Sequence, residues 1–421
     1  MKVVPLSATR IEKRRRKVIF IHNLFAREFA LCNSVPRMSG SSRFPSVAIR
    51  VRLARLFALF LAVPALAAPQ PGQFAPAKRA QLEAAISRFM AANSVPGVSV
   101  AVVENGAEEW SAGFGSADLE NFVPATSHTL YRLASISKSI TATAAMLLWQ
   151  QGKLDLDAPV QKYCSSFPQK DAPITTRELL GHLGGIRFYK SGSQDDAEYG
   201  NTRHFANPIQ GGIDFFKNDP LVAKPGSEFH YTTQGFTLVG CAIEGASGEN
   251  YVDYVRENVL TPAGMTHTVP DDRFAIIPYR TRFYSKDKSG AIANSDFLDS
   301  SYKIPGGGWL SSADDMAQFE VAILADLLVT RATREVMWTP LKPTDGQEDS
   351  YALGWGTGKD LGVLDVGHTG GQQGTSTNFM IVPERRAGVV VLINLDGVDA
   401  TALSTELMKI LLAPAATSPA K

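Results

Sequence analysis

Ser135 and Lys138 form a Ser-x-x-Lys motif, and the apolar residues that follow it recur at helical spacing. Side chains three positions apart lie on one face of a helix, so this spacing places a hydroxyl beside an amine. An amine in that position can accept the hydroxyl proton and turn the serine into a nucleophile without a histidine. The motif therefore predicts an acyl-transfer enzyme.

The motif alone is weak evidence, because the same letters recur elsewhere in the chain. The three other matches begin at Ser285, Ser300 and Ser418. None of these has an apolar helical pattern behind it, whereas the pattern after Lys138 continues to Gly152. The non-catalytic alternative for Ser135 is a serine that caps the N-terminus of a helix.

A lysine base needs help from its surroundings, since a free lysine has a pKa of about 10.4. Burial or a nearby cation must lower the pKa of Lys138, and a second polar group should help to move the proton. Tyr231 is the candidate for that group, and its alternative is a half-buried tyrosine in a loop.

An oxyanion needs backbone donors, and the run His368-Thr369-Gly370-Gly371 could supply one. Its glycines let a substrate approach the backbone closely. A plain glycine turn is the alternative.

Three segments, taken in order, resemble the motifs of the penicillin-recognising serine hydrolases. They are Ser135-Ile136-Ser137-Lys138, Tyr231-Thr232-Thr233 and His368-Thr369-Gly370. The resemblance is to the class C β-lactamase and D-Ala-D-Ala carboxypeptidase group, and it covers nearly all of residues 78–410. It implies that the site lies in a cleft between an α/β part and a helical part that carries Tyr231.

The resemblance also implies roles for individual residues. Ser135 would be the acylated nucleophile, and Lys138 and Tyr231 would share the work of general base and acid. The backbone amides of Ser135 and Gly371 would form the oxyanion hole. Contacts to the substrate are implied for the other motif residues, Thr233, His368, Thr369 and Gly370.

Two positions depart from the pattern of the group and bear on the substrate. Thr233 stands where the group has Asn or Ser, and His368 stands where it has a lysine that attracts a substrate carboxylate. Both departures resemble the esterase and peptidase branches and the mitochondrial serine β-lactamase-like branch. We therefore expect a hydrolase of ester or amide (peptide) bonds. The alternatives are a weak β-lactamase or D-Ala carboxypeptidase, and a non-catalytic homologue that binds peptidoglycan or peptide.

Other catalytic classes lack their motifs in this chain. It contains neither the Gly-x-Ser-x-Gly of a Ser-His-Asp hydrolase nor the His-Glu-x-x-His of a metallohydrolase. Cys and His residues do not show zinc-ligand spacing, so no metal and no cofactor are expected. The formal net charge is +1, and no basic stripe beyond the N-terminal region indicates a nucleic-acid partner. The expected partner is a small-molecule or peptide substrate, and no feature indicates an oligomeric state.

Local patterns predict an α+β fold. Amphipathic helices are expected at 77–92 and 401–412, one hairpin at 98–115 around Asn105-Gly106, and a second at 378–394. A long, mostly helical stretch with loops separates them. These patterns predict one antiparallel sheet built from both ends of the chain, flanked by the terminal helices, with an inserted helical region. Cys164 and Cys241 could form a disulfide or remain two buried thiols.

The N-terminal region has the features of a targeting segment. Residues 1–67 are predicted to contain a signal peptide that starts at Met38, with basic residues, an apolar run at 56–63 and a small-residue cleavage pattern. The apolar run is too short for a stable membrane span. Residues 68–76 would be a flexible leader, 77–412 the hydrolase domain and 413–421 a disordered tail. A periplasmic or secreted location is expected. The alternative is a mitochondrial transit peptide, because 1–67 contain only two acidic residues, Glu12 and Glu28.

Overall fold

The computed structural model describes residues 74–190, 198–345 and 349–414. The predicted targeting segment, residues 68–73 of the leader and residues 415–421 of the tail lie outside these ranges. At the start of the described chain, the ring of Phe74 stacks on that of Trp110, with centroids 6.3 Å apart.

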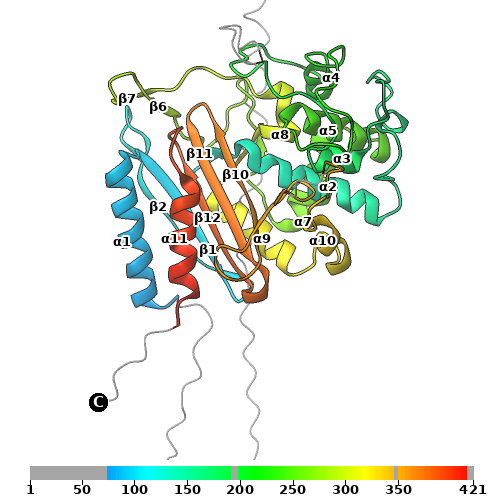
Figure 1. Cartoon of the computed structure of the whole chain (residues 1–421). Coiled ribbons are helices and arrows are strands. Elements are labelled where there is room, and N and C mark those ends of the chain that lie inside the picture. Colours follow the sequence, from blue (N-terminus) through cyan, green and yellow to red (C-terminus); the bar gives the residue numbers. More distant parts are fainter. Residues whose placement is uncertain (1–73, 191–197, 346–348, 415–421) are drawn as a thin grey trace, which may run out of the picture. The chain divides into compact units, whose positions relative to one another are not determined.

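Strands from near both ends of the described chain form one antiparallel sheet of seven strands, in the order β3-β2-β1-β12-β11-β10-β9 (Figure 1). The strands are β1 (Gly97–Glu104), β2 (Ala107–Asp118), β3 (Val123–Pro124), β9 (Gly356–Gly358), β10 (Asp365–Gln372), β11 (Thr375–Val382) and β12 (Ala387–Ile393). The first hairpin joins the last one where β1 pairs with β12. The predicted sheet built from both chain ends is confirmed.

Turn chemistry explains both hairpins. Asn105 and Gly106 join β1 to β2 and have positive φ angles of 56° and 80°, which suits the tight turn that strand twist favours. Between β11 and β12 the chain makes a short 3₁₀ turn, η5 (Pro383–Arg385), and Arg386 follows with φ 48°.

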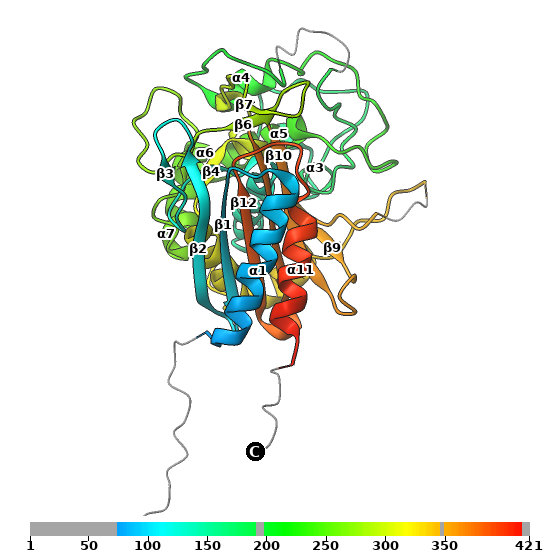
Figure 2. The same ribbon diagram turned by 90° about the vertical axis from the view of Figure 1, so that its left-hand side faces the viewer.

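The two terminal helices, α1 (Pro76–Asn93) and α11 (Ala400–Leu412), lie side by side on one face of the sheet (Figure 2). Strand β1 is buried on both faces, and its side chains alternate between two cores. The core under the terminal helices includes Leu82, Ile86, Val98, Val100, Val102, Leu403 and Leu407. Ala101 and Val103 of β1 face the other core, which extends into the helical part.

The helical part occupies the middle of the chain, as predicted (Figure 1). Its α-helices are α2 (Ser137–Gln150), α3 (Thr176–Leu180), α4 (Pro208–Ile213), α5 (Thr233–Ser247), α6 (Tyr251–Val255), α7 (Thr261–Ala263), α8 (Ile304–Gly307), α9 (Ala313–Leu324) and α10 (Arg331–Met337). Its other helical turns are η1 (Ala134–Ile136), η2 (Val160–Lys162), η3 (Arg256–Leu260) and η4 (Ser301–Lys303). Helix α2 is buried over most of its circumference, which is typical of a helix at the centre of a core.

Two small sheets lie outside the large sheet, in the segments that connect it to the helical part. One contains β4 (Tyr131–Arg132), β8 (Trp309–Ser311) and β5 (Val269–Pro270), and the other contains β6 (Tyr284–Lys286) and β7 (Ile292–Asn294). The β4–β8 pairing fixes the chain immediately before Ser135. No helix in the described ranges is long and apolar enough to cross a lipid bilayer.

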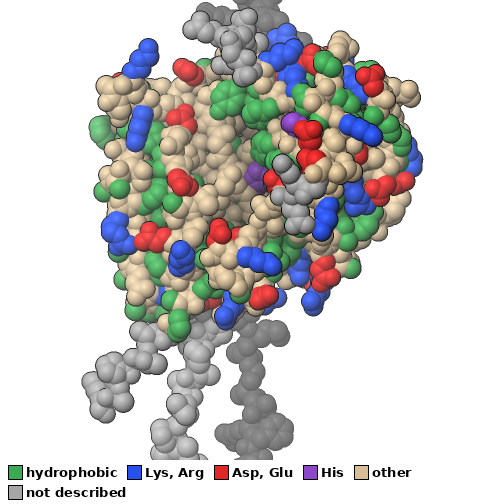
Figure 3. All heavy atoms as spheres, in the orientation of Figure 1, with side chains coloured by type: hydrophobic (Ala, Val, Ile, Leu, Met, Phe, Trp, Pro, Cys, Tyr) green, Lys and Arg blue, Asp and Glu red, His purple; other side chains and the backbone are tan. Residues whose placement is uncertain are grey.

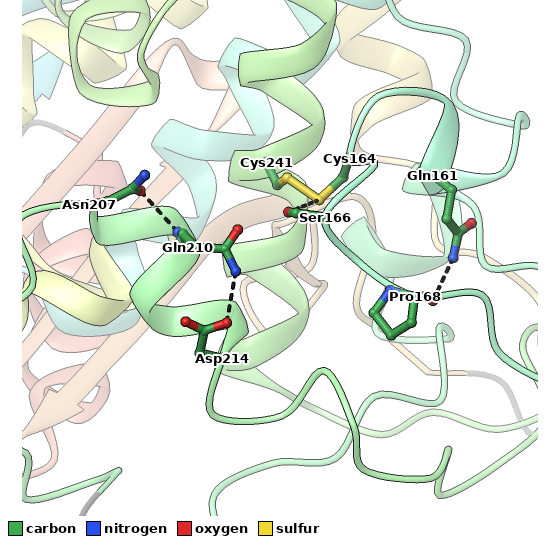
Figure 4. The surroundings of a disulfide bond; sticks show 8 residues. All are labelled: Gln161, Cys164, Ser166, Pro168, Asn207, Gln210, Asp214 and Cys241. Carbon is green, nitrogen blue, oxygen red and sulfur yellow. Dashed lines mark hydrogen bonds between the residues drawn. A yellow bond between two sulfur atoms is a disulfide. The ribbon is translucent and has the colours of Figure 1, made fainter.

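Cys164 and Cys241 form a disulfide, so the structure decides between the two alternatives that the sequence left open (Figure 4). The bond ties the segment after η2 to α5, and the two Cα atoms lie 5.4 Å apart. Because the cysteines are 77 residues apart in the chain, only the packed helical part brings them together.

Removing this disulfide should destabilise the protein. We expect the double variant Cys164→Ser, Cys241→Ser to lose about 2–4 kcal/mol of unfolding free energy in urea denaturation, because the cross-link restricts the unfolded chain. Reductant should destabilise the wild type but leave the variant unchanged. Peptide mapping that finds both wild-type cysteines free without reductant would contradict the assignment.

Candidate active site

Ser135 lies in η1, the single 3₁₀ turn that leads into α2. The chain is held from two sides two residues before Ser135, because the Leu133 amide donates to Trp309 O (2.9 Å) and its carbonyl accepts from Thr377 Oγ1 (3.0 Å). Ala134 has a φ of 47°, a left-handed conformation that non-glycine residues adopt rarely. The turn thus presents Ser135 as the partly exposed residue between buried neighbours.

Lys138 is fully buried beneath Ser135. Its Nζ lies 2.9 Å from Ser135 Oγ, 2.8 Å from Gly306 O and 3.4 Å from Thr233 Oγ1, and all three partners are uncharged. Burial lowers the pKa of Lys138 well below its usual value, and the positive charge of Lys303 lowers it further. The arrangement favours an unprotonated amine beside the serine hydroxyl.

Tyr231 lies beside the Ser135–Lys138 pair, two residues before α5 begins. Thr232 caps that helix by accepting from the Gly235 amide. The Tyr231 ring lies 4.8 Å from Lys138 Nζ, and its hydroxyl is hydrogen-bonded with Ser135. Burial raises the pKa of Tyr231, and the hydrogen bond with Ser135 offsets this only in part. Tyr231 is therefore a neutral phenol, able to donate a proton.

His368 is buried on β10 and bonded through both ring nitrogens. Nδ1 faces the Thr369 carbonyl, which can only accept, so Nδ1 carries the hydrogen. Nε2 then accepts from the Tyr351 hydroxyl at 2.8 Å. Burial, together with the charge of Lys138, lowers the pKa of His368 to about 3. This position therefore holds no cation.

Strand β10 brings the glycine motif next to the nucleophile. A Cβ at Gly370 would lie 2.2 Å from Leu133 O and 2.3 Å from Thr377 Oγ1, so only glycine allows this contact with the chain before Ser135. Gly371 is exposed, and a Cβ there would meet nothing within 4 Å. In the described residues β9 pairs with β10 only at 365–367, so the edge from His368 onward is not covered by that strand.

Two cavities flank this part of β10, where the surface is hollowed between the sheet and the helical part (Figure 3). One, of ≈ 450 Å³, is lined by residues that include Tyr231, Tyr351, Asp360, Asp365, His368 and Thr369. The other, of ≈ 500 Å³, is lined by Tyr199, Gly371, Gln372, Gln373, Thr375, Asp396 and Gly397. Tyr231 and the β10 residues His368, Thr369 and Gly371 therefore border open space.

The structure brings Ser135, Lys138, Thr233, Tyr231 and His368 together, places Gly370 against the chain before Ser135, and adds other residues to the site. Tyr351 and His182 belong to no motif. His182 is packed between the rings of Tyr231 and Tyr351, with centroids 4.4 and 4.6 Å away. Gly306 lies in the glycine-rich run Gly306-Gly307-Gly308, and its carbonyl accepts from Lys138 Nζ. Of the other Ser-x-x-Lys matches, Ser300 has no hydrogen-bond partner for its hydroxyl, so it does not form a Ser–Lys pair.

The fold and the arrangement of the site together define a class, that of the β-lactamase-related proteins. A family model described as Beta-lactamase matches residues 82–411, and the chain belongs to this family. It is similar to the human serine beta-lactamase-like protein LACTB, mitochondrial, with 32% identity over 379 residues and 69% of each chain covered. It is also similar to protein flp of Staphylococcus aureus strain NCTC 8325, with 26% identity, covering 75% of this chain and 63% of that one.

Solved structures agree on the fold. The octameric penicillin-binding protein homologue from Pyrococcus abyssi superposes with a TM-score of 0.69 and 29% identity, covering 79% of this chain and 77% of that one. The D-amino acid amidase from Ochrobactrum anthropi SV3 gives a TM-score of 0.69 at 22% identity, covering 80% and 99%, and shows the fold alone. Family membership supports a hydrolase.

Adjacent glycines on β10 offer a matched test of the contact with η1. Gly370→Ala should lower the unfolding free energy by about 1–3 kcal/mol through overpacking and should slow labelling of Ser135 by an active-site reagent. Gly371→Ala keeps its backbone amide and meets no atoms, so its stability should equal that of the wild type. Equal stability of the two variants would show that the contact at Gly370 is unimportant.

His368 should make stability depend on pH. Its pKa is about 3 in the folded protein and about 6.5 when unfolded, so between these values the unfolded state binds more protons. The unfolding free energy should therefore rise with pH up to about 6.5. His368 should account for up to about 1.4 kcal/mol of that rise per pH unit. Denaturation of wild type and His368→Gln from pH 4.5 to 8 measures this. The difference should be constant above pH 7 and shrink below 6; parallel curves throughout would contradict the neutral buried histidine.

Proposed function

We propose that this protein is a serine hydrolase that cleaves an ester or amide (peptide) bond through an acyl-enzyme on Ser135, within a domain spanning residues 77–412. The observation that carries the proposal is the 2.9 Å contact between Ser135 Oγ and the buried Lys138 Nζ. Because the partners of Lys138 are uncharged, its amine has a free lone pair for the serine proton.

In acylation, Ser135 Oγ attacks the substrate carbonyl carbon while its proton moves to Lys138 Nζ. Gly306 O and Thr233 Oγ1 remain acceptors for the N–H groups of the ammonium that forms. The backbone amides of Ser135 and Gly371 would hold the oxyanion, and the packing of Gly370 on Leu133 supports their proximity.

Collapse of the tetrahedral intermediate needs a proton on the leaving group. Tyr231 is suited to deliver it, because burial keeps its phenol neutral. Lys138 can then return its proton to Tyr231, which restores the neutral amine. In deacylation, water would take the place of the leaving group and the route would run in reverse. Its proton would pass by way of Tyr231 to Lys138 as its oxygen attacks the acyl carbon, and Lys138 would return a proton to Ser135 Oγ as the acyl–Oγ bond breaks.

The charges around the site bear on the substrate. His368 is neutral, and Asp360 and Asp365 line the cavity beside it. This environment supports an acyl group without a carboxylate at that end, and therefore an ester or amide rather than a β-lactam. Thr233, Thr369 and Gly370 would contact the substrate along β10. Proteins of this fold include one named a D-stereospecific amidohydrolase, which fits amide cleavage.

We also propose export to the periplasm or beyond. The Cys164–Cys241 disulfide supports an oxidising compartment. The human relative is named mitochondrial, which supports the alternative address. N-terminal sequencing of the mature protein, together with cell fractionation, separates the two, and retention in the cytoplasm with an uncleaved N-terminus would exclude both.

Ser135→Ala should abolish turnover of p-nitrophenyl esters and D-amino-acid amides and remove the fluorophosphonate adduct seen by mass spectrometry. Lys138→Ala should slow acylation by about 10²–10⁴-fold, the usual effect of losing a general base. The matched control is Ser300→Ala, a buried serine of another Ser-x-x-Lys match without a hydrogen bond to lose. Turnover that survives Ser135→Ala would refute the proposal, and a folded wild type without any adduct would favour a binding protein.

A further inference from the structure

Lys303 is a second buried lysine near the site, with only 2% of its surface exposed. It ends η4, directly before α8. Its Nζ lies 5.6, 5.5 and 5.5 Å from the ring centroids of Tyr189, Tyr199 and Tyr302. Aromatic faces at this distance attract a cation, so the three rings form a box that can hold an ammonium in a buried place.

The box is connected to the Ser135–Lys138 pair by two routes. Through the backbone, Lys303 is three residues before Gly306, whose carbonyl accepts from Lys138 Nζ at 2.8 Å. Through side chains, the Tyr189 hydroxyl is hydrogen-bonded with Thr233, and Thr233 Oγ1 lies 3.4 Å from Lys138 Nζ. Gly306 and Thr233 thus connect the surroundings of Lys303 to Lys138.

The charged and titratable groups around the two lysines favour Lys303 as the amine that carries the proton. Facing Lys303, besides its three tyrosines, are Arg132 and Asp271, which are paired with each other at 2.7 Å. Burial and Arg132 lower the pKa of Lys303 to about 7, while Asp271 opposes them.

Lys138 faces Tyr231, His182 and His368 instead, and none of these brings a negative charge. Burial holds the two histidines neutral by lowering the pKa of each. The pKa of Lys138 is lowered first by burial and then by the charge of Lys303.

We propose that Lys303 is a positioning residue for the Ser135–Lys138 centre, whose boxed ammonium keeps Lys138 unprotonated and supplies a positive charge that His368 does not. This inference rests on the proposed function, because it concerns the base of that reaction. A cation repels the proton from a neighbouring amine. Lys303 would do so from a buried position among the three tyrosine rings.

The experiment compares the pH dependence of kcat/KM for a p-nitrophenyl ester in wild type, Lys303→Met and Lys303→Arg. Without the cation, the pKa of Lys138 should rise, so the acid limb of Lys303→Met should move up by about one pH unit or more. At pH 6 the rate should fall about tenfold, whereas at pH 9 it should stay within about threefold of wild type. Lys303→Arg keeps a charge and should keep the wild-type limb.

Lys170→Met is the matched control, because it removes a half-buried lysine that also lies over a ring, 5.3 Å from that of Phe167, but away from the site. Its acid limb should not move. A uniform loss in Lys303→Met at every pH, or the same shift in Lys303→Arg, would mean a structural role and overturn the inference. An unmoved limb with an inactive Ser135→Ala variant rejects Lys303 alone, whereas turnover in Ser135→Ala rejects the proposed function itself.

A measurement on the wild type covers the case in which Lys303→Met does not fold. Lysine labelled with ¹⁵N at Nζ reports each titration by NMR, and the Lys138 signal is assigned by its loss in Lys138→Ala. We expect Lys138 to be neutral at pH 7 and a second buried lysine to titrate near there. A protonated Lys138 at pH 7 would overturn the inference.

Discussion

The site depends on one constraint, the burial of the Lys138 amine among partners that carry no charge. A buried ammonium without a counterion is costly, so the amine favours its neutral form. That form is the one that can take a proton from Ser135. The 3₁₀ turn at η1, the carbonyl of Gly306 and the hydroxyl of Thr233 come from three separate segments, and each contributes to this burial.

The sheet positions the segments that bury Lys138 relative to one another. Strands from both chain ends pair at β1 and β12, and β10 lies two strands further on. Gly370 on β10 packs directly on the backbone before Ser135, so the strand carrying the oxyanion candidate and the turn carrying the nucleophile are joined without an intervening side chain. The terminal helices cover the opposite face and exclude water from the strands.

Much of this could be predicted from the sequence, because the signals are local. Asn105-Gly106 predicted the first hairpin, the apolar period predicted α1, α2 and α11, and the ordered motifs predicted which residues share a site. Tyr351 and His182 could not be found in this way, since they contribute through ring contacts and a hydrogen bond between distant segments. Lys303 was hidden for a related reason. Its Ser-x-x-Lys match has no helical pattern behind it, and its proximity to the site depends on how η4 packs.

The sequence by itself determined the order of the elements and the candidates for nucleophile, base and proton-donating tyrosine, because periodicity and motif spacing are properties of short segments. The tertiary structure decided the chemical state of these groups. Whether Lys138 and His368 carry a proton depends on burial and on charges from remote segments, which spacing does not encode. It also decided that Cys164 and Cys241 meet. The Ser-x-x-Lys motif thus supplies the proposed reacting atoms, and the packed environment favours the neutral form of the amine.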